Sequence, residues 1–203
     1  MHDTGAASFL YPFLGERETD DDAVLEDVRR SIQMKAEEIG ALREQTLTEG
    51  AETLEAAAEA MRRAGRVLAL GNGGSATDAM DLVADLERAG RPAIDLTADP
   101  AILTAIANDV GVEAVFARQV IAYGRAGDAL VALSTSGGSG NVISALAEAR
   151  RRGLATIALV GYDGGRIAAE QLADHVIVTR SQHIPRIQEA QASAYHVLCE
   201  LIA

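Results

Sequence analysis

Aromatic residues and cysteine are scarce in this sequence. Phe and Tyr together make up 3% of its residues, Trp is absent, and there is a single cysteine, Cys199. One cysteine excludes an intramolecular disulfide framework and a cysteine-based zinc cluster, and it fits a reducing compartment. With so few aromatic residues, the core has to be built from Ala, Val, Leu and Ile.

Long apolar runs and an excess of positive charge are also missing. No apolar stretch approaches the roughly 20 residues that span a bilayer, and the first residues show no signal-peptide pattern. We therefore expect a cytoplasmic protein that does not contact membranes. Lys and Arg number 18 against 30 Asp and Glu, a formal net charge of −12. Such an acidic chain does not attract nucleic acid non-specifically, although a local pocket can still bind a small anion.

The first 65 residues differ in pattern from the rest of the chain. Residues 1–20 are predicted to form a loose N-terminal segment. Over 21–65, apolar residues recur at helical spacing and predict two amphipathic helices, the second from about Glu44 to Ala64. These helices belong to the same single domain as residues 66–203, and they either cover its core or pack against another subunit.

From Arg66 onward, short apolar runs alternate with helical stretches. The predicted strands are 66–70, 93–97, 129–134, 155–160 and 175–179, and the last helix is predicted from Pro185 to about Ile202. Continuous apolar strands are typical of a parallel sheet that is buried on both faces. The sequence therefore predicts an α/β fold with helices on both sides of a parallel sheet.

Two glycine-rich loops each follow a predicted strand and precede a helix. The first reads Gly71-Asn72-Gly73-Gly74-Ser75, and the second reads Ser134-Thr135-Ser136-Gly137-Gly138-Ser139. Ligands of such sheets bind beyond the carboxyl ends of the strands. Hydroxyls, free backbone N–H groups and a helix N-terminus without Lys or Arg suit a phosphomonoester. The alternative is a tight turn whose serine only caps the helix.

Nucleotide-binding patterns are broken in both loops. The spacing of a P-loop is absent, and the first loop does not continue as G-x-G-x-x-G, since position 76 is Ala. We therefore expect no nucleotide cofactor.

Three motifs, taken in this order, resemble the sugar isomerase (SIS) family: GNGGSATDAM, ALSTSGGSGNV and RIQEAQASAYHVL. Within that family the chain is most similar to the phosphoheptose isomerases, which interconvert sedoheptulose 7-phosphate and a heptose 7-phosphate. Residues 103–120 share this similarity, and the resemblance covers about residues 25–203. It implies a three-layer α/β/α sandwich on a five-stranded parallel sheet, and a homotetramer with active sites at subunit interfaces.

The resemblance also implies roles for individual residues. The sugar phosphate would be held by Ser134, Thr135, Ser136 and Ser139. The sugar would contact Asn72, Ser75 and Asp109, with Gly73 and Gly74 in the same binding loop. Gln188 falls on the glutamine at the family's metal site. His196 falls on the catalytic histidine, which is both a metal ligand and a general acid/base.

Two positions depart from the family pattern. Where the heptose isomerases carry a His and, four residues later, a Glu that serves as the base, this chain has Asp81 and Asp85. The spacing keeps both carboxylates on one helix face, and the added oxygen shifts the metal preference away from zinc. We predict one divalent metal, Zn or Mn, at Asp81, Asp85, Gln188 and His196, with Asp85 as base and His196 as acid/base.

The predicted function is an aldose–ketose isomerase that acts on a phosphorylated sugar through a cis-enediol. One alternative is a non-catalytic SIS-fold protein that binds a sugar phosphate or regulates a partner. Another is a different sugar-phosphate isomerase of the same fold. At the level of residues, Asp81 and Asp85 could instead form a solvated face or pair with Arg88 or Arg91, and His183 is a second acid/base candidate.

Overall fold

A computed structural model describes residues 21–203, so the predicted loose segment 1–20 lies outside the described residues. The chain divides into two units, Met1–Glu38 and Ile39–Ala203. The helices are α2 (Asp21–Arg63), α3 (Gly74–Arg88), α4 (Pro100–Asp109), the 3₁₀ turn η2 (Val112–Ala114), α5 (Val115–Tyr123), α6 (Gly140–Arg151), α7 (Gly165–Ala169) and α8 (Ile184–Ile202). The strands are β1 (Val67–Gly71), β2 (Ala93–Asp95), β3 (Ala129–Ser134), β4 (Ala155–Gly161) and β5 (His175–Thr179).

The five strands form one parallel sheet in the order β2-β1-β3-β4-β5. At the centre of the sheet, β3 pairs with β1 on one side and β4 on the other. Leu130 of β3 lies beside Leu68 of β1 and beside Thr156 of β4. All five predicted strands are confirmed within about two residues. β1 and β3 are buried along their whole length, as their apolar sequences predict.

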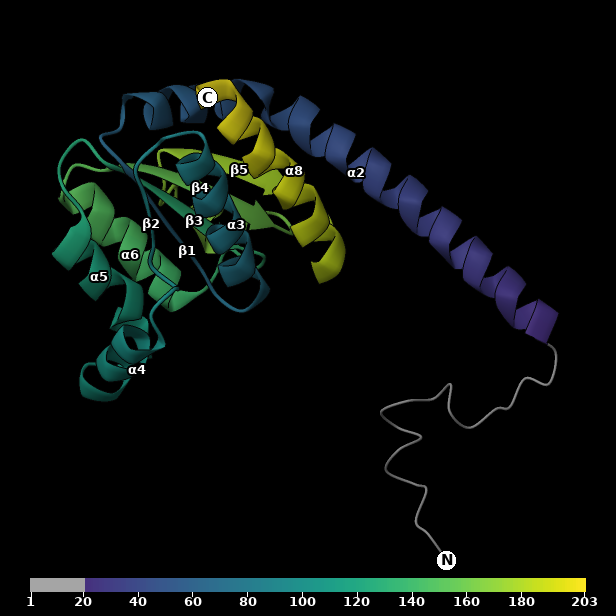
Figure 1. Ribbon diagram of the computed structural model, residues 1–203, viewed down its shortest axis with the longest axis horizontal. Coiled ribbons are helices and arrows are strands. Elements are labelled where there is room, and N and C mark those ends of the chain that lie inside the picture. The colour runs from purple at the N-terminus through teal and green to yellow at the C-terminus, as the bar shows by residue number, and fades with distance from the viewer. Residues whose placement is uncertain (1–20) are drawn as a thin grey trace, which may run out of the picture. The chain divides into compact units, whose positions relative to one another are not determined.

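Alternate strand residues face opposite sides of the sheet, and each side has its own hydrophobic core. The C-terminal part of α2, α3 and α8 pack with residues such as Val131 on one face. On the other face, α5, α6 and α7 pack with residues such as Leu130 (Figure 1). The predicted three-layer α/β/α sandwich is thereby confirmed. No helix within residues 21–203 is long and apolar enough to cross a membrane.

The N-terminal region differs from its prediction, because α2 is one continuous helix of 43 residues where we expected two helices. Gly50, which lies within the second expected helix, does not break it, and a Cβ there would make only ordinary contact with Ile177 at 3.6 Å. In the second unit, Leu54, Ala57 and Met61 of this helix are buried in the first core. This part of α2 therefore covers the core.

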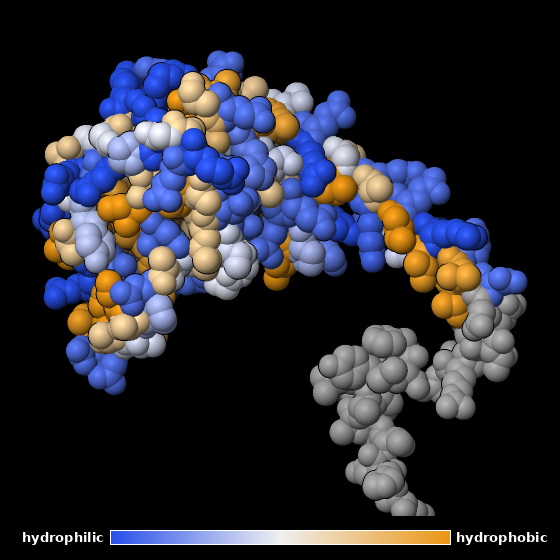
Figure 2. All heavy atoms as spheres, in the orientation of Figure 1, coloured by the Kyte–Doolittle hydropathy of each residue, from blue (hydrophilic) through white to orange (hydrophobic). Residues whose placement is uncertain are grey.

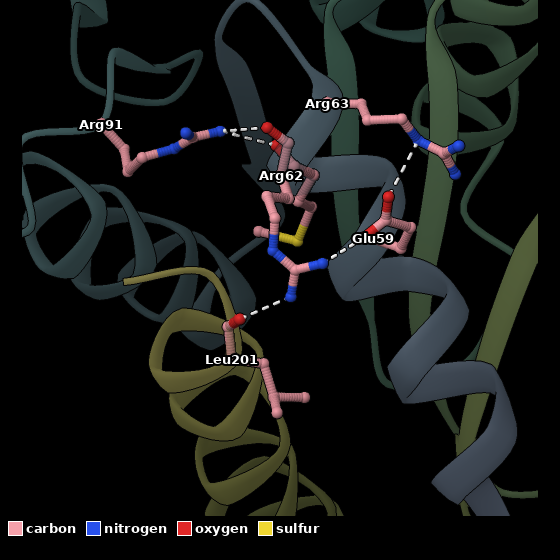
Figure 3. A network of polar contacts seen from close by, with 6 residues as sticks. Glu59, Arg62, Arg63, Arg91 and Leu201 are labelled. Atoms are coloured by element: carbon pink, nitrogen blue, oxygen red, sulfur yellow. Dashed lines mark hydrogen bonds and ion pairs between the residues drawn. The ribbon is translucent and has the colours of Figure 1, made fainter.

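Two helix C-termini, those of α2 and α8, are stabilised by arginines (Figure 3). Arg91 donates from Nη2 to the carbonyls of Met61 and Arg62, at 2.9 Å each. Arg62 donates to the carbonyl of Leu201 at 2.7 Å and also pairs with Glu59. Since the last carbonyls of a helix have no partner within the helix and carry partial negative charge, a cation there is favourable.

We expect Arg91→Met to lower the free energy of unfolding by about 1–3 kcal/mol, because it removes two hydrogen bonds from a charged donor to carbonyls at the end of α2. Urea denaturation measures the change. Arg63→Met is the matched control: Arg63 is an exposed neighbour that makes only a 3.4 Å ion pair with Glu59, and its loss should cost less than about 1 kcal/mol. Equal losses in the two variants would contradict the role given to Arg91.

Candidate active site

The second glycine-rich loop connects the carboxyl end of β3 to the first turn of α6. Ser134 ends the strand, and its hydroxyl lies 3.5 Å from that of Ser139, the residue before α6. Ser139 makes no side-chain capping bond, although it occupies the capping position. The simple capping alternative therefore does not account for its hydroxyl, which contacts only Ser134 among the described side chains and lies where a ligand could bind at the positive end of the helix.

Backbone contacts hold this loop in shape. Gly137 has φ +60°, and a Cβ there would lie 2.1 Å from the carbonyl oxygen of Gly164, in the loop between β4 and α7. The carbonyl of Gly137 also accepts from the N–H of Ile167 at 2.9 Å. Only glycine fits such a position, because it combines a left-handed backbone with a close backbone approach. The predicted phosphate loop is thus held on one side by backbone contacts with the loop between β4 and α7 and with the first turn of α7.

The two glycine-rich loops are joined by a pair of side-chain amides. Asn72 donates to Asn141 at 2.9 Å, and Asn141 donates back to Asn72 at 3.0 Å. Asn141 was not among the predicted site residues; its position directly after Gly140 in the second loop was the only available signal. The amide pair fixes the distance between the loops that follow β1 and β3.

A cavity of about 330 Å³ lies beside this amide pair. Its walls include Asn72, Gly73, Ala76, Thr104 and Asn141. Ser75, predicted to contact the sugar, is buried to 3% exposure beneath the loop. Asp109, the other predicted contact, ends α4, is exposed and accepts from Asn108 at 2.7 Å. The cavity gives a bound molecule room beside the first glycine-rich loop and Asn141.

Helices α3 and α8 pack together and bring three side chains into a cluster. Asp81, Asp85 and His196 each offer an oxygen or nitrogen, and these atoms lie within 4.8 Å of one another. His196 Nδ1 lies 2.7 Å from Asp85 Oδ2, and His196 Nε2 lies 3.6 Å from Asp81 Oδ2. Two carboxylates and one imidazole are a suitable donor set for a divalent cation such as Mn²⁺ or Zn²⁺, so these residues fit the metal that the sequence suggested.

The ion-pair alternative applies to one of these aspartates. Arg88 pairs with Asp85, whereas Arg91 binds the end of α2. Asp85 therefore lies between a cation and His196, and its side chain is 14% exposed. Because Asp85 Oδ2 meets His196 Nδ1, the other ring nitrogen, Nε2, is left facing Asp81.

Gln188, predicted as a metal ligand, points toward the first turn of α3. Its Nε2 lies 3.4 Å from Asp78 Oδ2, and a Cβ on Gly74 would be 2.2 Å from the same atom. Burial raises the pKa of Asp78, Gln188 opposes that shift, and the charge of Asp81 adds to it. Asp78 was missed by the sequence analysis, although it precedes Asp81 by three residues on the same helix face.

The single cysteine, Cys199, is buried near this cluster. Burial, followed by the charges of Asp85 and Asp81, raises the pKa of Cys199 to about 12. The thiol is therefore protonated at neutral pH in the metal-free protein. His183, the second acid/base candidate, precedes α8 and is exposed.

The chain is similar to known proteins over most of its length. Residues 36–161 match the SIS domain family. The phosphoheptose isomerase of Roseiflexus sp. is 42% identical over 190 residues, 89% of this chain and 88% of that protein. The phosphoheptose isomerase of Nitratiruptor sp. is 48% identical over 150 residues, 71% of this chain and 79% of that protein. The structure of the phosphoheptose isomerase from Neisseria gonorrhoeae superimposes with a TM-score of 0.81 at 39% identity, covering 87% of this chain and 99% of that one.

Proposed function

Because the chain belongs to the phosphoheptose isomerase family of SIS-domain proteins, we propose that it interconverts sedoheptulose 7-phosphate and a heptose 7-phosphate. The reaction moves a proton between C1 and C2 through a cis-enediol. It needs a base at those carbons, an acid for the oxygens and groups that stabilise the enediolate. The phosphate supplies binding energy away from the reacting carbons, which positions them.

One observation supports this proposal more than any other: contacts join the predicted phosphate loop to the first glycine-rich loop, and join α8 to α3, the helix that follows that loop and carries Asp85. Asn141, directly after the phosphate loop, bonds with Asn72 of the first glycine loop. Two residues later Gly74 lies against Gln188, which donates to Asp78. Asp81 and Asp85 then follow along the same face of α3. The groups that bind the anion and those that move protons therefore belong to one framework.

Within that framework each group has a proposed task. Ser134, Thr135, Ser136 and Ser139 bind the phosphate, and Asn72, Ser75 and Asp109 contact the sugar hydroxyls. Asp85 takes the proton, while His196, hydrogen-bonded to it at 2.7 Å, exchanges protons with the sugar oxygens. A divalent cation at Asp81, Asp85 and His196, with Gln188 as the further predicted ligand, would polarise the substrate carbonyl.

The test is turnover in D₂O. Purified protein is incubated with sedoheptulose 7-phosphate, with and without added Mn²⁺ or Zn²⁺, and followed by proton NMR. We expect an aldose product that carries deuterium at C2, because a proton held by an active-site carboxyl exchanges with solvent. Binding of the sugar phosphate without turnover or exchange, under every metal condition, would favour the non-catalytic alternative instead. The replacement of the family's His and Glu by Asp81 and Asp85 is the observation that keeps this alternative open.

We also propose that the protein is a homotetramer. Residues 21–38 of α2 carry an exposed apolar stripe, and Figure 2 shows hydrophobic side chains gathered along this stretch of helix. The stripe consists of Val24, Leu25, Val28 and Ile32. A helix face of this kind is typical of packing against another chain.

Light scattering should give a mass of about 85 kDa, four times the chain mass of 21.3 kDa. Introducing charge at the centre of the stripe with Val28→Glu and Ile32→Glu should lower the measured mass, because buried unpaired carboxylates are costly. The matched control is Arg29→Glu, on an exposed residue of the same helix. A wild-type mass near that of a single chain would contradict the assembly.

A further inference from the structure

Two consecutive residues of α8, Tyr195 and His196, each hold one carboxylate of α3. The Tyr195 hydroxyl donates to Asp81 Oδ2 at 2.8 Å, and His196 Nδ1 lies 2.7 Å from Asp85 Oδ2. Neighbouring helix residues point about 100° apart, yet both reach α3 because their partners are one helical turn apart. The two rings contact each other, with centroids 4.6 Å apart.

Tyr195 is a core residue whose hydroxyl ends at the candidate site. The residue is 3% exposed and packs in the hydrophobic core with Leu82 and Leu198. Such a side chain has little freedom to move, so its hydroxyl is a donor at a fixed point. Asp81, in contrast, has a half-exposed side chain and would otherwise be free to change rotamer.

The bond from Tyr195 determines where the Asp81 carboxylate lies. The oxygen that accepts it, Oδ2, is the same oxygen that lies 3.6 Å from His196 Nε2. Within the described part of the chain, Tyr195 is the hydrogen-bond donor to Asp81. Without this donor, the longer 3.6 Å approach of His196 Nε2 is the contact that would remain to hold Oδ2 on the His196 side.

We propose that Tyr195 is a positioning residue, which holds the Asp81 carboxylate beside His196 Nε2 and thereby sets the divalent-cation affinity of the Asp81–Asp85–His196 cluster. Groups that hydrogen-bond to metal ligands orient them, and their loss commonly lowers metal affinity 10- to 100-fold. The effect is large here because an aspartate is short, so a wrong rotamer moves its oxygens out of reach. The inference rests on the metal site of the proposed function and does not require turnover.

Tyr195→Phe tests it, because this change removes the hydroxyl and keeps the ring. The variant leaves Asp81 half-exposed and open to water, so it creates no buried unpaired group and the fold is retained. Mn²⁺ binding to the full-length metal-free protein is measured by electron paramagnetic resonance, from the loss of the free Mn²⁺ signal. We expect Tyr195→Phe to weaken binding 10- to 100-fold. The matched control, Tyr123→Phe, changes a partly buried tyrosine in the other hydrophobic core and should leave binding unchanged.

A double-mutant cycle separates positioning from a general structural effect. If Tyr195 acts through Asp81, Tyr195→Phe should weaken Mn²⁺ binding in the wild type and have no further effect in Asp81→Asn. Three outcomes would each overturn the inference. Tyr195→Phe could bind Mn²⁺ with wild-type affinity, it could weaken Mn²⁺ binding equally in the wild type and in Asp81→Asn, or the wild-type protein could bind no Mn²⁺ at all. Tyr195-dependent Mn²⁺ binding in a protein that fails to convert sedoheptulose 7-phosphate would support the inference and contradict the proposed isomerase.

Discussion

Asp85→Asn should lower kcat for sedoheptulose 7-phosphate by about 10²- to 10⁴-fold, the range for loss of a general base, and leave the affinity for the sugar phosphate within about threefold. The amide keeps the size of the side chain and cannot take a proton from carbon. It can still hydrogen-bond to His196, which lies 2.7 Å away, so the packing of α3 on α8 is preserved. The affinity for the sugar phosphate should be unchanged, because the phosphate is proposed to bind at a different loop. NMR time courses of turnover give kcat, and calorimetry gives the affinity for the sugar phosphate.

A matched substitution controls for the loss of one negative charge. The control is Asp99→Asn. Asp99 lies at the start of α4, where its side chain accepts from the N–H of Ala101 at 2.8 Å, and Asn is as good a helix cap as Asp. This variant should keep wild-type kcat. Wild-type turnover in Asp85→Asn would remove Asp85 as the base. The next candidates would then be Asp78, whose pKa is raised by burial, and the histidines His183 and His196.

The sheet could be predicted from sequence because burial on both faces imposes a simple pattern. A strand such as 129–134 must be apolar throughout, since its alternate residues enter different cores. The N-terminal helix could not be predicted in the same way. A glycine inside a helix usually weakens it, and only the structure reveals that α2 continues without a break through Gly40, near the expected boundary, and through Gly50.

The candidate site was predictable where it consists of consecutive residues. The loop from Ser134 to Ser139 carries its hydroxyls and glycines in one stretch, so its chemistry is visible in the sequence. Contacts between α3 and α8 join residues more than 100 positions apart, and no single-sequence pattern reports them. For that reason the bond from Tyr195 to Asp81, and the contact of Gln188 with Asp78, emerged only from the structure.

The helix spacing also explains why Gln188 and His196 approach different carboxylates. Eight residues correspond to about 12 Å along a helix. Gln188 therefore meets the start of α3 at Gly74 and Asp78, while His196 meets the same helix further along, at Asp85. Asp81 lies between them, which makes it the carboxylate whose orientation matters most for a shared ion.

The double variant Ser136→Ala/Ser139→Ala should weaken binding of sedoheptulose 7-phosphate by about 10²- to 10⁴-fold. Each hydroxyl is proposed to donate to a charged phosphate oxygen, and such a bond contributes roughly 1.5–3 kcal/mol. Ser139 makes no capping bond with α6, so its replacement should not destabilise the helix. Ser136 accepts from the N–H of Gly138 at 3.2 Å, a bond on an exposed loop that water can replace. Calorimetry with the sugar phosphate and with inorganic phosphate measures the loss.

Parallel losses for the two ligands would assign the effect to the phosphate, because inorganic phosphate has no sugar to contact Asn72 or Asp109. Ser144→Ala, on α6 beyond the loop, is the matched control and should bind both ligands as the wild type does. Loss of affinity for the sugar phosphate alone would indicate that the phosphate binds elsewhere and that the hydroxyls of Ser136 and Ser139 contact the sugar. Unchanged affinity for both ligands in the double variant would contradict the loop assignment, and with it the framework in which the phosphate positions C1 and C2 beside Asp85 and His196.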